Sequence, residues 1–346
     1  MKKLSSLFFL FVLVFPRQGL AGSRFLMAAL GDSGTVGTSA ETPLGELGLS
    51  AFVTWGGLFH ALLFSRSASL ARRTFDGRLA PNGQISDNRY RLSWATGTEI
   101  LSHYVLLQEY LRIQDPNSRL DAFNVARVGA RTADLPAQAR FVSKLVREGK
   151  YDSLKYVVIA AGVNDVAMAT GPDSGMTDDD ALTRNIKAAL HELAVSNGEP
   201  VRVLVLPIPQ FLADLGRPEV KGRRVLPGLR SETLRPYLGF AKYWSEWSTQ
   251  DGYRERIEVL AKKNRAIERA VEEFRQEVSP ERLEPVFAAL PHTEIDFDYS
   301  CIVAADACHP SKEGHSRLAT MTWDWQPWFK LPCLSQIAIL PGRQRK

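Results

Sequence analysis

The chain has 346 residues, of which 45% are hydrophobic and 23% are charged, and this composition excludes a disordered or a fibrous protein. A chain of this length can bury a full-sized core, as one large domain or as two smaller ones. The formal charge of +5 comes from 43 basic and 38 acidic residues without a basic stripe, so we expect no nucleic acid partner.

The N-terminus, residues 1–21, has the three-part order of a secretory signal peptide. Two lysines precede an apolar run over residues 7–15, and small residues end the segment before Gly22. The apolar run is short for a membrane span, and a retained N-terminal anchor is the alternative. Cleavage removes three basic residues and no acid, which leaves 40 against 38 and a charge of +2. We therefore expect a secreted or periplasmic protein.

Five apolar runs predict the strands of a parallel sheet. Most of them are apolar on both faces, which is typical of strands that helices cover on both sides. The runs are residues 24–30, 121–129, 154–162 and 201–209, with a last strand over 284–290.

Helical patterns lie between these strands. The first covers residues 134–148, with Asp134 as its N-cap and with Gln138 among the apolar residues of one face. A longer pattern over residues 257–274 has its apolar face interrupted by Asn264. The alternation of strands and helices predicts an α/β protein, with three layers in the order α/β/α around a parallel sheet.

The domain organisation follows from the same alternation. A closing helix is expected over residues 312–325. Residues 41–100 and 210–250 fit the alternation poorly, so we expect them to be insertions on a single domain over residues 22–346. Loops beyond the strand ends are where α/β folds build their pockets.

Polar residues follow the first three predicted strands. Ser33 comes after the first strand, Gly129 after the second and Asn164 after the third. In an open parallel sheet these positions share one edge, so a hydroxyl, a backbone N–H and an amide would lie along it. Acyl transfer needs this set, with Ser33 as nucleophile and the N–H groups of Ser33, Gly129 and Asn164 as the oxyanion hole. Taken singly, each is also an ordinary turn, strand-end or cap residue.

A base for this serine is predicted near the C-terminus. Asp306 and His309 are three residues apart, so one turn can present both on one side. His309 would take the proton of Ser33, and Asp306 would fix the tautomer of His309 and stabilise its charged form. The alternatives are a turn cap for Asp306 and a surface histidine for His309. We expect His315, on the closing helix, to be a surface histidine.

Four sequence blocks in this order resemble the SGNH (GDSL-type) hydrolase superfamily. They are "GDS" with Ser33, "VGARTADL" with Gly129, "GVND" with Asn164, and "DACHP" with Asp306 and His309. The match spans roughly residues 24–325, nearly all of the mature chain. The resemblance implies a flavodoxin-like fold, hydrolysis of carboxyl esters and no metal or other cofactor.

Further segments are similar to the phospholipase B-like branch of this superfamily. They are residues 91–97, 124–140 and 308–319. This similarity implies an esterase or lipase that acts on lipid acyl esters, with transient contact with a membrane surface. The sequence departs from the family pattern in two places. Gly34 replaces the leucine that usually follows the motif, and we expect this change to loosen the nucleophile turn. Residues 210–250 do not match the family clearly, so ester hydrolysis is a safer inference than a phospholipid substrate.

Two other functions stay open at this point. A carbohydrate esterase that removes acetyl groups from an extracellular glycan uses the same scaffold, and a catalytically silent binding module keeps the fold without the activity. The sequence also holds three cysteines, at positions 301, 308 and 333. A bond between the first two would close a small loop around Asp306, a bond between the last two would tie that loop to the tail, and three idle thiols are the alternative.

Overall fold

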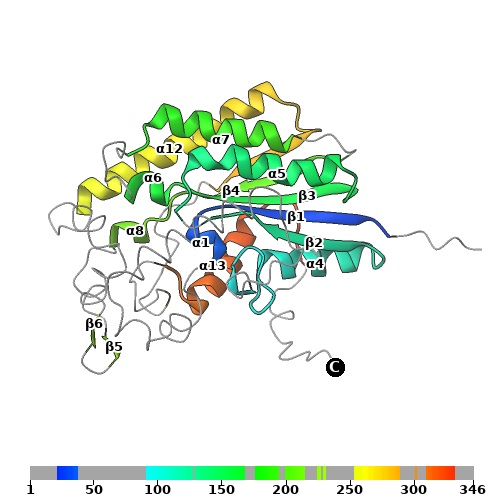
Figure 1. Ribbon diagram of the computed structural model, residues 1–346, viewed down its shortest axis with the longest axis horizontal. Coiled ribbons are helices and arrows are strands. Elements are labelled where there is room, and N and C mark those ends of the chain that lie inside the picture. Colours follow the sequence, from blue (N-terminus) through cyan, green and yellow to red (C-terminus); the bar gives the residue numbers. More distant parts are fainter. Residues whose placement is uncertain are drawn as a thin grey trace, which may run out of the picture.

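The computed structural model describes ten parts of the chain, and they build one five-stranded parallel sheet (Figure 1). The strand order across the sheet is β2, β1, β3, β4, β7. The strands are β1 (Arg24–Gly31), β2 (Arg119–Asn124), β3 (Ser153–Ala160), β4 (Val201–Val205) and β7 (Leu283–Phe287). The described residues are 22–37, 91–127, 129–167, 176–194, 199–214, 224–226, 229–230, 253–288, 301 and 309–331.

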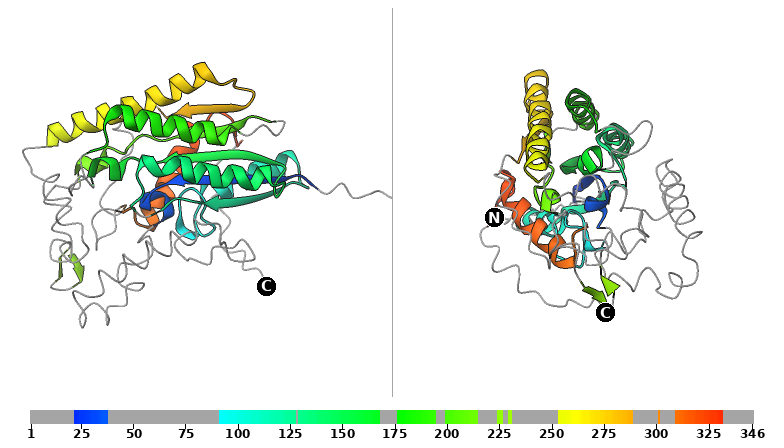
Figure 2. Two further views of the ribbon diagram at one scale, coloured as in Figure 1. Left: turned by 45° about the horizontal axis from the view of Figure 1, so that its top comes forward. Right: turned by 90° about the vertical axis from the view of Figure 1, so that its left-hand side faces the viewer.

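Helices cover both faces of this sheet, so the predicted α/β/α fold is confirmed (Figure 2). One face carries α5 (Leu135–Arg147), α7 (Asp179–Leu193) and α12 (Tyr253–Glu277). The other carries α4 (His103–Gln114) and α13 (Lys312–Trp325). Four short helices are α1 (Ser33–Val36), η2 (Thr132–Asp134), α6 (Val163–Ala167) and α8 (Phe211–Asp214). A separate antiparallel ribbon pairs β5 (Arg224–Leu226) with β6 (Leu229–Arg230).

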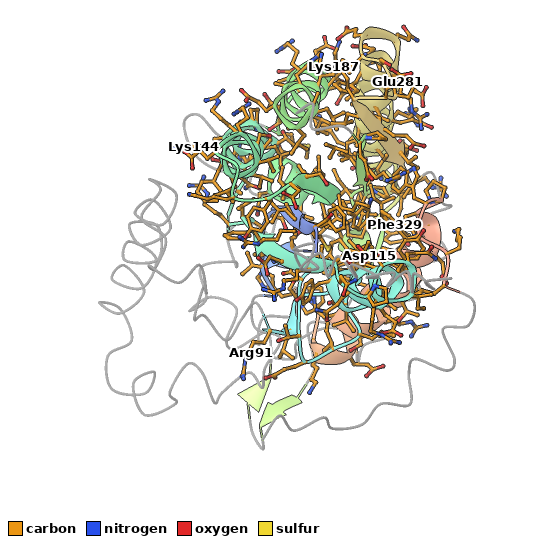
Figure 3. The ribbon with its side chains drawn as sticks, turned by 90° about the vertical axis from the view of Figure 1, so that its right-hand side faces the viewer. Arg91, Asp115, Lys144, Lys187, Glu281 and Phe329 are labelled. Atoms are coloured by element: carbon orange, nitrogen blue, oxygen red, sulfur yellow. The ribbon has the colours of Figure 1, made fainter. Side chains whose placement is uncertain are left out.

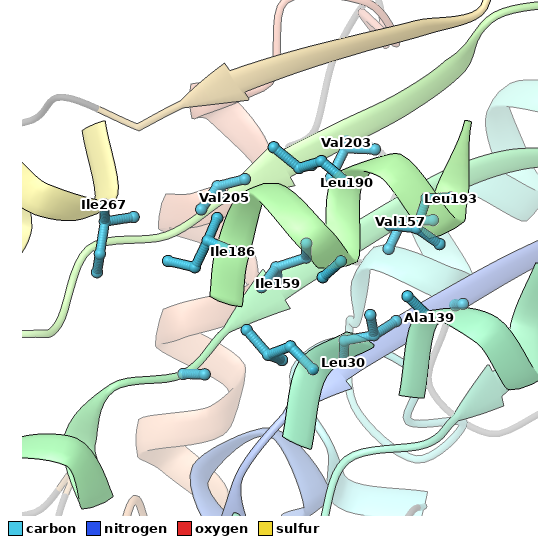
Figure 4. Close-up of a cluster of buried hydrophobic side chains, with 14 of the residues drawn as sticks. Leu30, Ala139, Val157, Ile159, Ile186, Leu190, Leu193, Val203, Val205 and Ile267 are labelled. Atoms are coloured by element: carbon cyan, nitrogen blue, oxygen red, sulfur yellow. The ribbon is translucent and has the colours of Figure 1, made fainter. Parts of the chain in front are cut away.

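The two faces of the strands fill two apolar cores. Leu30, Val157 and Val203 point to the side of α5, α7 and α12, as Figure 4 shows. Their neighbours in sequence, such as Ala29 and Val158, point to the side of α4 and α13. Successive strand residues face opposite sides, so a strand buried on both sides must be apolar at nearly every position. This is why the sheet could be predicted from continuous apolar runs.

Charged side chains occupy the outer surfaces of the helices. Figure 3 shows Lys144 on α5 and Lys187 on α7 at the outside of the molecule. Lys187 Nζ joins α7 to α12 through Glu273 at 2.9 Å and Glu277 at 2.7 Å. Exposed pairs of this kind contribute little to stability, so the apolar cores hold these layers together.

Two strands end four or five residues earlier than the sequence predicts, and β3 and β7 end two or three residues early. The second was expected to run to Gly129 but ends at Asn124, and the fourth was expected to run to residue 209 but ends at Val205. The side-chain amide of Asn124 donates to the carbonyl of Thr35 at 2.9 Å, and over residues 125–127 only the backbone N–H groups of Val125 and Arg127 still bond to β1, at 2.9 Å and 3.1 Å. Beyond Val205, the chain has prolines at two of the next four positions, and proline has no N–H for a sheet ladder.

The helices also differ from the prediction in detail. The helix α12 continues through Asn264, whose amide accepts from Ile208 N at 2.7 Å and donates to Ile208 O at 3.0 Å. Asp134 precedes α5 as predicted, but its carboxylate makes no cap bond and instead accepts from Arg131 N at 3.0 Å. The sequence analysis did not predict α4 or α7. The expected closing helix is α13, with the predicted bounds.

Part of the first expected insertion belongs to the core. The last ten residues of the range 41–100 are described, and Leu92, Trp94 and Ala95 are buried there. The rest of this range, most of 210–250 and the expected signal peptide lie outside the described residues. Within the described helices, none is long and apolar enough to cross a membrane.

A buried histidine joins α4 to the sheet and to α13. His103 Nε2 lies 2.8 Å from Thr322 Oγ1, and His103 Nδ1 lies 3.0 Å from the hydroxyl of Tyr156. The hydroxyl of Thr322 donates its only proton to Leu318 O at 2.6 Å, so it accepts from Nε2–H. The imidazole is therefore neutral with its proton on Nε2, and Tyr156 donates to Nδ1. Burial lowers the pKa of His103 to about 3.

We predict that His103 makes the fold sensitive to acid. Its pKa rises from about 3 in the native state to the ordinary 6.5 on unfolding, so stability is lost as the pH falls below 6.5, by about 1.4 kcal/mol per pH unit. His103→Phe should lower the free energy of unfolding at pH 7.5, because Tyr156 loses its partner, and this cost should shrink toward pH 5. Urea unfolding at several pH values measures it.

The control for this experiment is His191→Phe, since His191 is an exposed histidine on α7. The loss of unfolding free energy caused by His191→Phe should not shrink between pH 7.5 and pH 5. A His103→Phe cost that stays constant from pH 7.5 to pH 5 would contradict the prediction.

Candidate active site

Ser33 lies in a hydrogen-bonded turn directly after the central strand of the candidate site. The strand β1 ends at Gly31, and Ser33 opens the short helix α1. The carbonyl of Asp32 accepts from Thr35 N and from the next residue's N at 3.1 Å each, and its carboxylate accepts from Gly34 N at 3.0 Å. Gly34, which replaces the family's leucine, therefore contributes its N–H to a turn that these bonds hold in place.

The structure brings Ser33 and His309 together. The Oγ of Ser33 lies 2.8 Å from Nε2 of His309, across 276 positions of sequence. His309 is buried and stands just before α13, whose N-cap Ser311 accepts from Gly314 N at 3.1 Å. A serine hydroxyl that donates to Nε2 leaves the other imidazole proton on Nδ1. Asp306, the predicted partner of that nitrogen, lies outside the described residues.

Gly129 and Asn164 lie on the loops to either side of Ser33. In the sheet, β1 stands between β2 and β3, so the loop after β1 carries Ser33 between the loops that carry Gly129 and Asn164. Gly129 has φ of 76°, a left-handed conformation that favours glycine. The amide Nδ2 of Asn164 donates to Ala130 O at 2.8 Å, which ties the two outer loops together. The second N–H of that amide can serve another acceptor.

A second bond between these outer loops uses Asp165. Its carboxylate is fully buried and accepts from Thr132 N at 2.9 Å and from Thr132 Oγ1 at 2.7 Å. The acid next to Asn164 thus holds the loop of Gly129 in place.

A polar network below α1 was missed by the sequence analysis. Ser93 Oγ donates to Thr35 O at 2.7 Å, and Asn124 Nδ2 bonds to Thr35 O at 2.9 Å and to Thr96 Oγ1 at 3.0 Å. These residues join the segment 91–97 to the nucleophile turn.

Two buried titratable groups near His309 have polar side-chain atoms without a hydrogen bond among the described residues. In the part of the chain that the structure describes, Asp32 Oδ2 and both ring nitrogens of His315 have no partner. Burial raises the pKa of Asp32 to about 7, against the opposing effects of the Gly34 N–H and of His309. Burial, together with the neighbouring His309, lowers the pKa of His315 to about 3. The prediction of a surface histidine at 315 is wrong, because its face of α13 turns to the core.

The last two features to compare with the sequence analysis are a metal site and the pairing of the cysteines. Among the described residues, no cluster of histidine, cysteine, aspartate or glutamate could hold a metal ion. Cys301 is buried, and Cys308 and Cys333 lie outside the described residues, so the cysteine pairing stays a prediction.

Comparison with known families places this site in context. Residues 27–320 match the model of the GDSL-like lipase/acylhydrolase family. The chain belongs to this family. It is a carboxylic ester hydrolase, as the family assignment implies, and the suspected SGNH (GDSL-type) superfamily is confirmed. A search of curated proteins finds no match.

Several solved structures are similar to the chain of this GDSL-like hydrolase. LAE5, an alpha/beta hydrolase enzyme from the metagenome of Lake Arreo, is 17% identical with a TM-score of 0.39, over 88% of this chain and 95% of that chain. A variant of Axe2, an acetyl xylan esterase from Geobacillus stearothermophilus, is 15% identical with a TM-score of 0.42, over 90% and 98%. The lipase Lip_vut3 from a goat rumen metagenome is 14% identical with a TM-score of 0.38, over 87% and 97%.

We predict that the buried carboxyl of Asp32 destabilises the fold at neutral and alkaline pH. Its pKa is about 7 in the native state and has the ordinary value of 3.8 in the unfolded state. The free energy of unfolding therefore falls by about 1.4 kcal/mol per pH unit as the pH rises between these values. Asp32→Asn keeps an oxygen for Gly34 N and cannot ionise. It should be more stable than the wild type at pH 8, with the gain vanishing near pH 4, as measured by urea unfolding.

Asp178→Asn is the matched control for this variant. Asp178 caps α7 through Ala181 N at 2.7 Å, as Asp32 caps α1, but it is exposed to water. Its replacement should give no comparable gain. Equal stability of Asp32→Asn and wild type at pH 8 would contradict the prediction.

Proposed function

We propose that the protein is an exported serine esterase or lipase that hydrolyses carboxyl esters through an acyl-enzyme on Ser33. The observation that carries the proposal is the 2.8 Å contact between Ser33 Oγ and His309 Nε2. It is the geometry that a nucleophile and its general base require. Proposed export depends on residues 1–21, and N-terminal sequencing of secreted material, expected to begin near Gly22, tests it.

The proposed first half-reaction transfers the acyl group to the enzyme. Ser33 gives its proton to His309 Nε2 as its oxygen bonds to the carbonyl carbon of the ester. The negative charge moves to the carbonyl oxygen, where the N–H groups of Ser33 and Gly129 and the amide of Asn164 would stabilise it. The C–O bond to the alcohol then breaks, and His309 returns the proton to the departing alcohol. Asp306 would stabilise the charged imidazole throughout.

The second half-reaction releases the acid. Water gives a proton to His309 as its oxygen attacks the acyl carbon, and the bond to Ser33 breaks as Ser33 takes that proton back. The two halves together consume one water and return the enzyme unchanged. This chemistry needs no cofactor.

Lipid acyl esters are the proposed substrates. The proposal is supported by the similarity of residues 91–97, 124–140 and 308–319 to the phospholipase B-like branch. The first two of these segments meet beneath the nucleophile turn, where Ser93 and Asn124 both bond to Thr35 O. Lipid substrates would also require transient contact with a membrane surface. The open alternatives are a glycan acetyl esterase and a silent binding module.

Ser33→Ala should abolish hydrolysis of p-nitrophenyl acetate while circular dichroism shows an unchanged fold. A fluorophosphonate probe should label Ser33 in the wild type and no other serine. The matched control is Ser279→Ala, which changes an exposed serine after α12 and should keep full activity and labelling. Labelling of a different serine, or activity in Ser33→Ala, would refute the mechanism, and an inert wild type would favour the binding module.

The substrate proposal is tested by comparing kcat/KM across three substrate classes. We expect kcat/KM to rise from p-nitrophenyl acetate to p-nitrophenyl palmitate, and fatty acid to be released from phosphatidylcholine vesicles. Acetylated xylan should be hydrolysed poorly. A preference for acetylated xylan together with acetate esters would favour the glycan esterase instead.

A further inference from the structure

A fully buried glutamine on α5 is hydrogen-bonded to the strand that precedes the nucleophile. Gln138 lies on the apolar face of its helix, where an amide without partners would cost stability. Its Oε1 accepts from Gly31 N at 2.8 Å, and its Nε2 donates to Gly31 O at 3.0 Å. Both polar ends of the side chain are thus used on one residue, 107 positions earlier in the chain.

Gly31 is the point where the chain leaves the sheet toward Ser33. The neighbouring strand β2 ends at Asn124, which pairs with Ala29, so Gly31 lies beyond the last pair of that ladder. Its φ of 148° and its contact with β3, where a Cβ would stand 2.0 Å from Ala160 O, allow only glycine here. The side chain of Gln138 therefore supplies the acceptor for Gly31 N and a second donor for Gly31 O, which also accepts from Arg127 N at 3.1 Å.

The same segment of chain also holds the two loops beside the nucleophile. Ala130 O accepts from Asn164, and Thr132 donates twice to Asp165. Six residues after Thr132, Gln138 bonds to Gly31. The loop after β2 and the first turns of α5 are thus bonded both to the loop after β3 and to the end of β1.

We propose that Gln138 is a positioning residue for the nucleophile, which fixes the peptide of Gly31 and so the direction in which Ser33 meets His309. This inference rests on the proposed function of Ser33. Gln138 touches no reacting atom and acts through the backbone of residues 31–33. A displacement of about 1 Å at a reacting atom can lower a rate by about 10²-fold, so loss of this contact should appear in the chemical step.

The chain offers a matched control in Gln326. This glutamine is also fully buried, accepts from Phe329 N at 2.6 Å and from Trp328 N at 2.8 Å, and donates to Phe329 O at 2.7 Å. It stands just past the far end of α13 from His309, and a helix of 14 residues is about 21 Å long. Gln138 and Gln326 thus both bond to the N–H and the C=O of one peptide residue, near the nucleophile in one case and remote from it in the other, and Gln326 accepts one further N–H.

The test compares Gln138→Met with Gln326→Met in the full chain. Both should lower the urea midpoint, because each removes the amide partner of a buried N–H and C=O, and Gln326→Met at least as much, because it also removes the acceptor of Trp328 N. Only Gln138→Met should lower kcat for p-nitrophenyl acetate and the rate of fluorophosphonate labelling, by about 10-fold to 100-fold, with KM nearly unchanged. Gln138→Glu, which keeps an oxygen for Gly31 N, should recover part of both rates.

Two results would overturn the inference. One is a kcat of Gln138→Met within twofold of the wild type, and the other is an equal loss of kcat in Gln326→Met. If Gln138→Met does not fold, Gln138→Asn decides, since its amide is one methylene too short to reach both groups of Gly31 and a wild-type kcat in that variant would also overturn the inference. Failure of the proposed function is separate, because it appears as labelling of a serine other than Ser33 in the wild-type protein.

Discussion

Peptide groups at the carboxyl ends of the parallel strands must find hydrogen bonds after the sheet ladder has stopped. A buried N–H or C=O without a partner costs as much as a lost hydrogen bond, so these positions cannot be left open. In this protein, side-chain amides meet the need. Gln138 pairs with Gly31 after β1, and Asn264 pairs with Ile208 after β4. Asn124, at the end of β2, bonds to the carbonyl of Thr35 in the nucleophile turn.

These amides explain how a site made of loops can be well defined. Ser33, Gly129 and Asn164 lie on three separate connections, which would be free to move independently if only their strands held them. The bonds from Asn164 to Ala130 and from Asp165 to Thr132 make the two outer loops one unit. The helix α13 lies on the other face of the sheet from α5 and α7. His309, just before the N-terminal end of α13, contacts Ser33 from that side. Precision in the site therefore depends on buried polar contacts behind it.

The sequence analysis succeeded where a single segment carries the signal. Continuous apolar runs predicted β1, β3 and β4, and the ordered motifs pointed to Ser33 and His309, which the fold brings together. It failed where the partner lies far along the chain. The strand ending at Asn124 was predicted to reach Gly129 because the alternation of side chains continues, whereas over residues 125–127 only the backbone N–H groups of Val125 and Arg127 still bond to β1. The fully buried place of His315 depends on which face of α13 meets the sheet, and this face is set by tertiary packing.

The sequence analysis did not predict the partners of the polar residues on apolar helix faces. Gln138 and Asn264 both interrupt stripes that otherwise predict burial, and each proves to be bonded to a strand end. Asp32 and His315 are also buried polar residues. Among the described residues, Asp32 Oδ2 and both ring nitrogens of His315 have no hydrogen-bond partner. Burial holds His315 neutral and raises the pKa of Asp32 to about 7, and both lie near His309. Such groups lower stability unless something else retains them, and departures from local rules concentrate at functional sites. Their position around the proposed base is therefore itself an argument that this edge of the sheet was selected for chemistry rather than for stability.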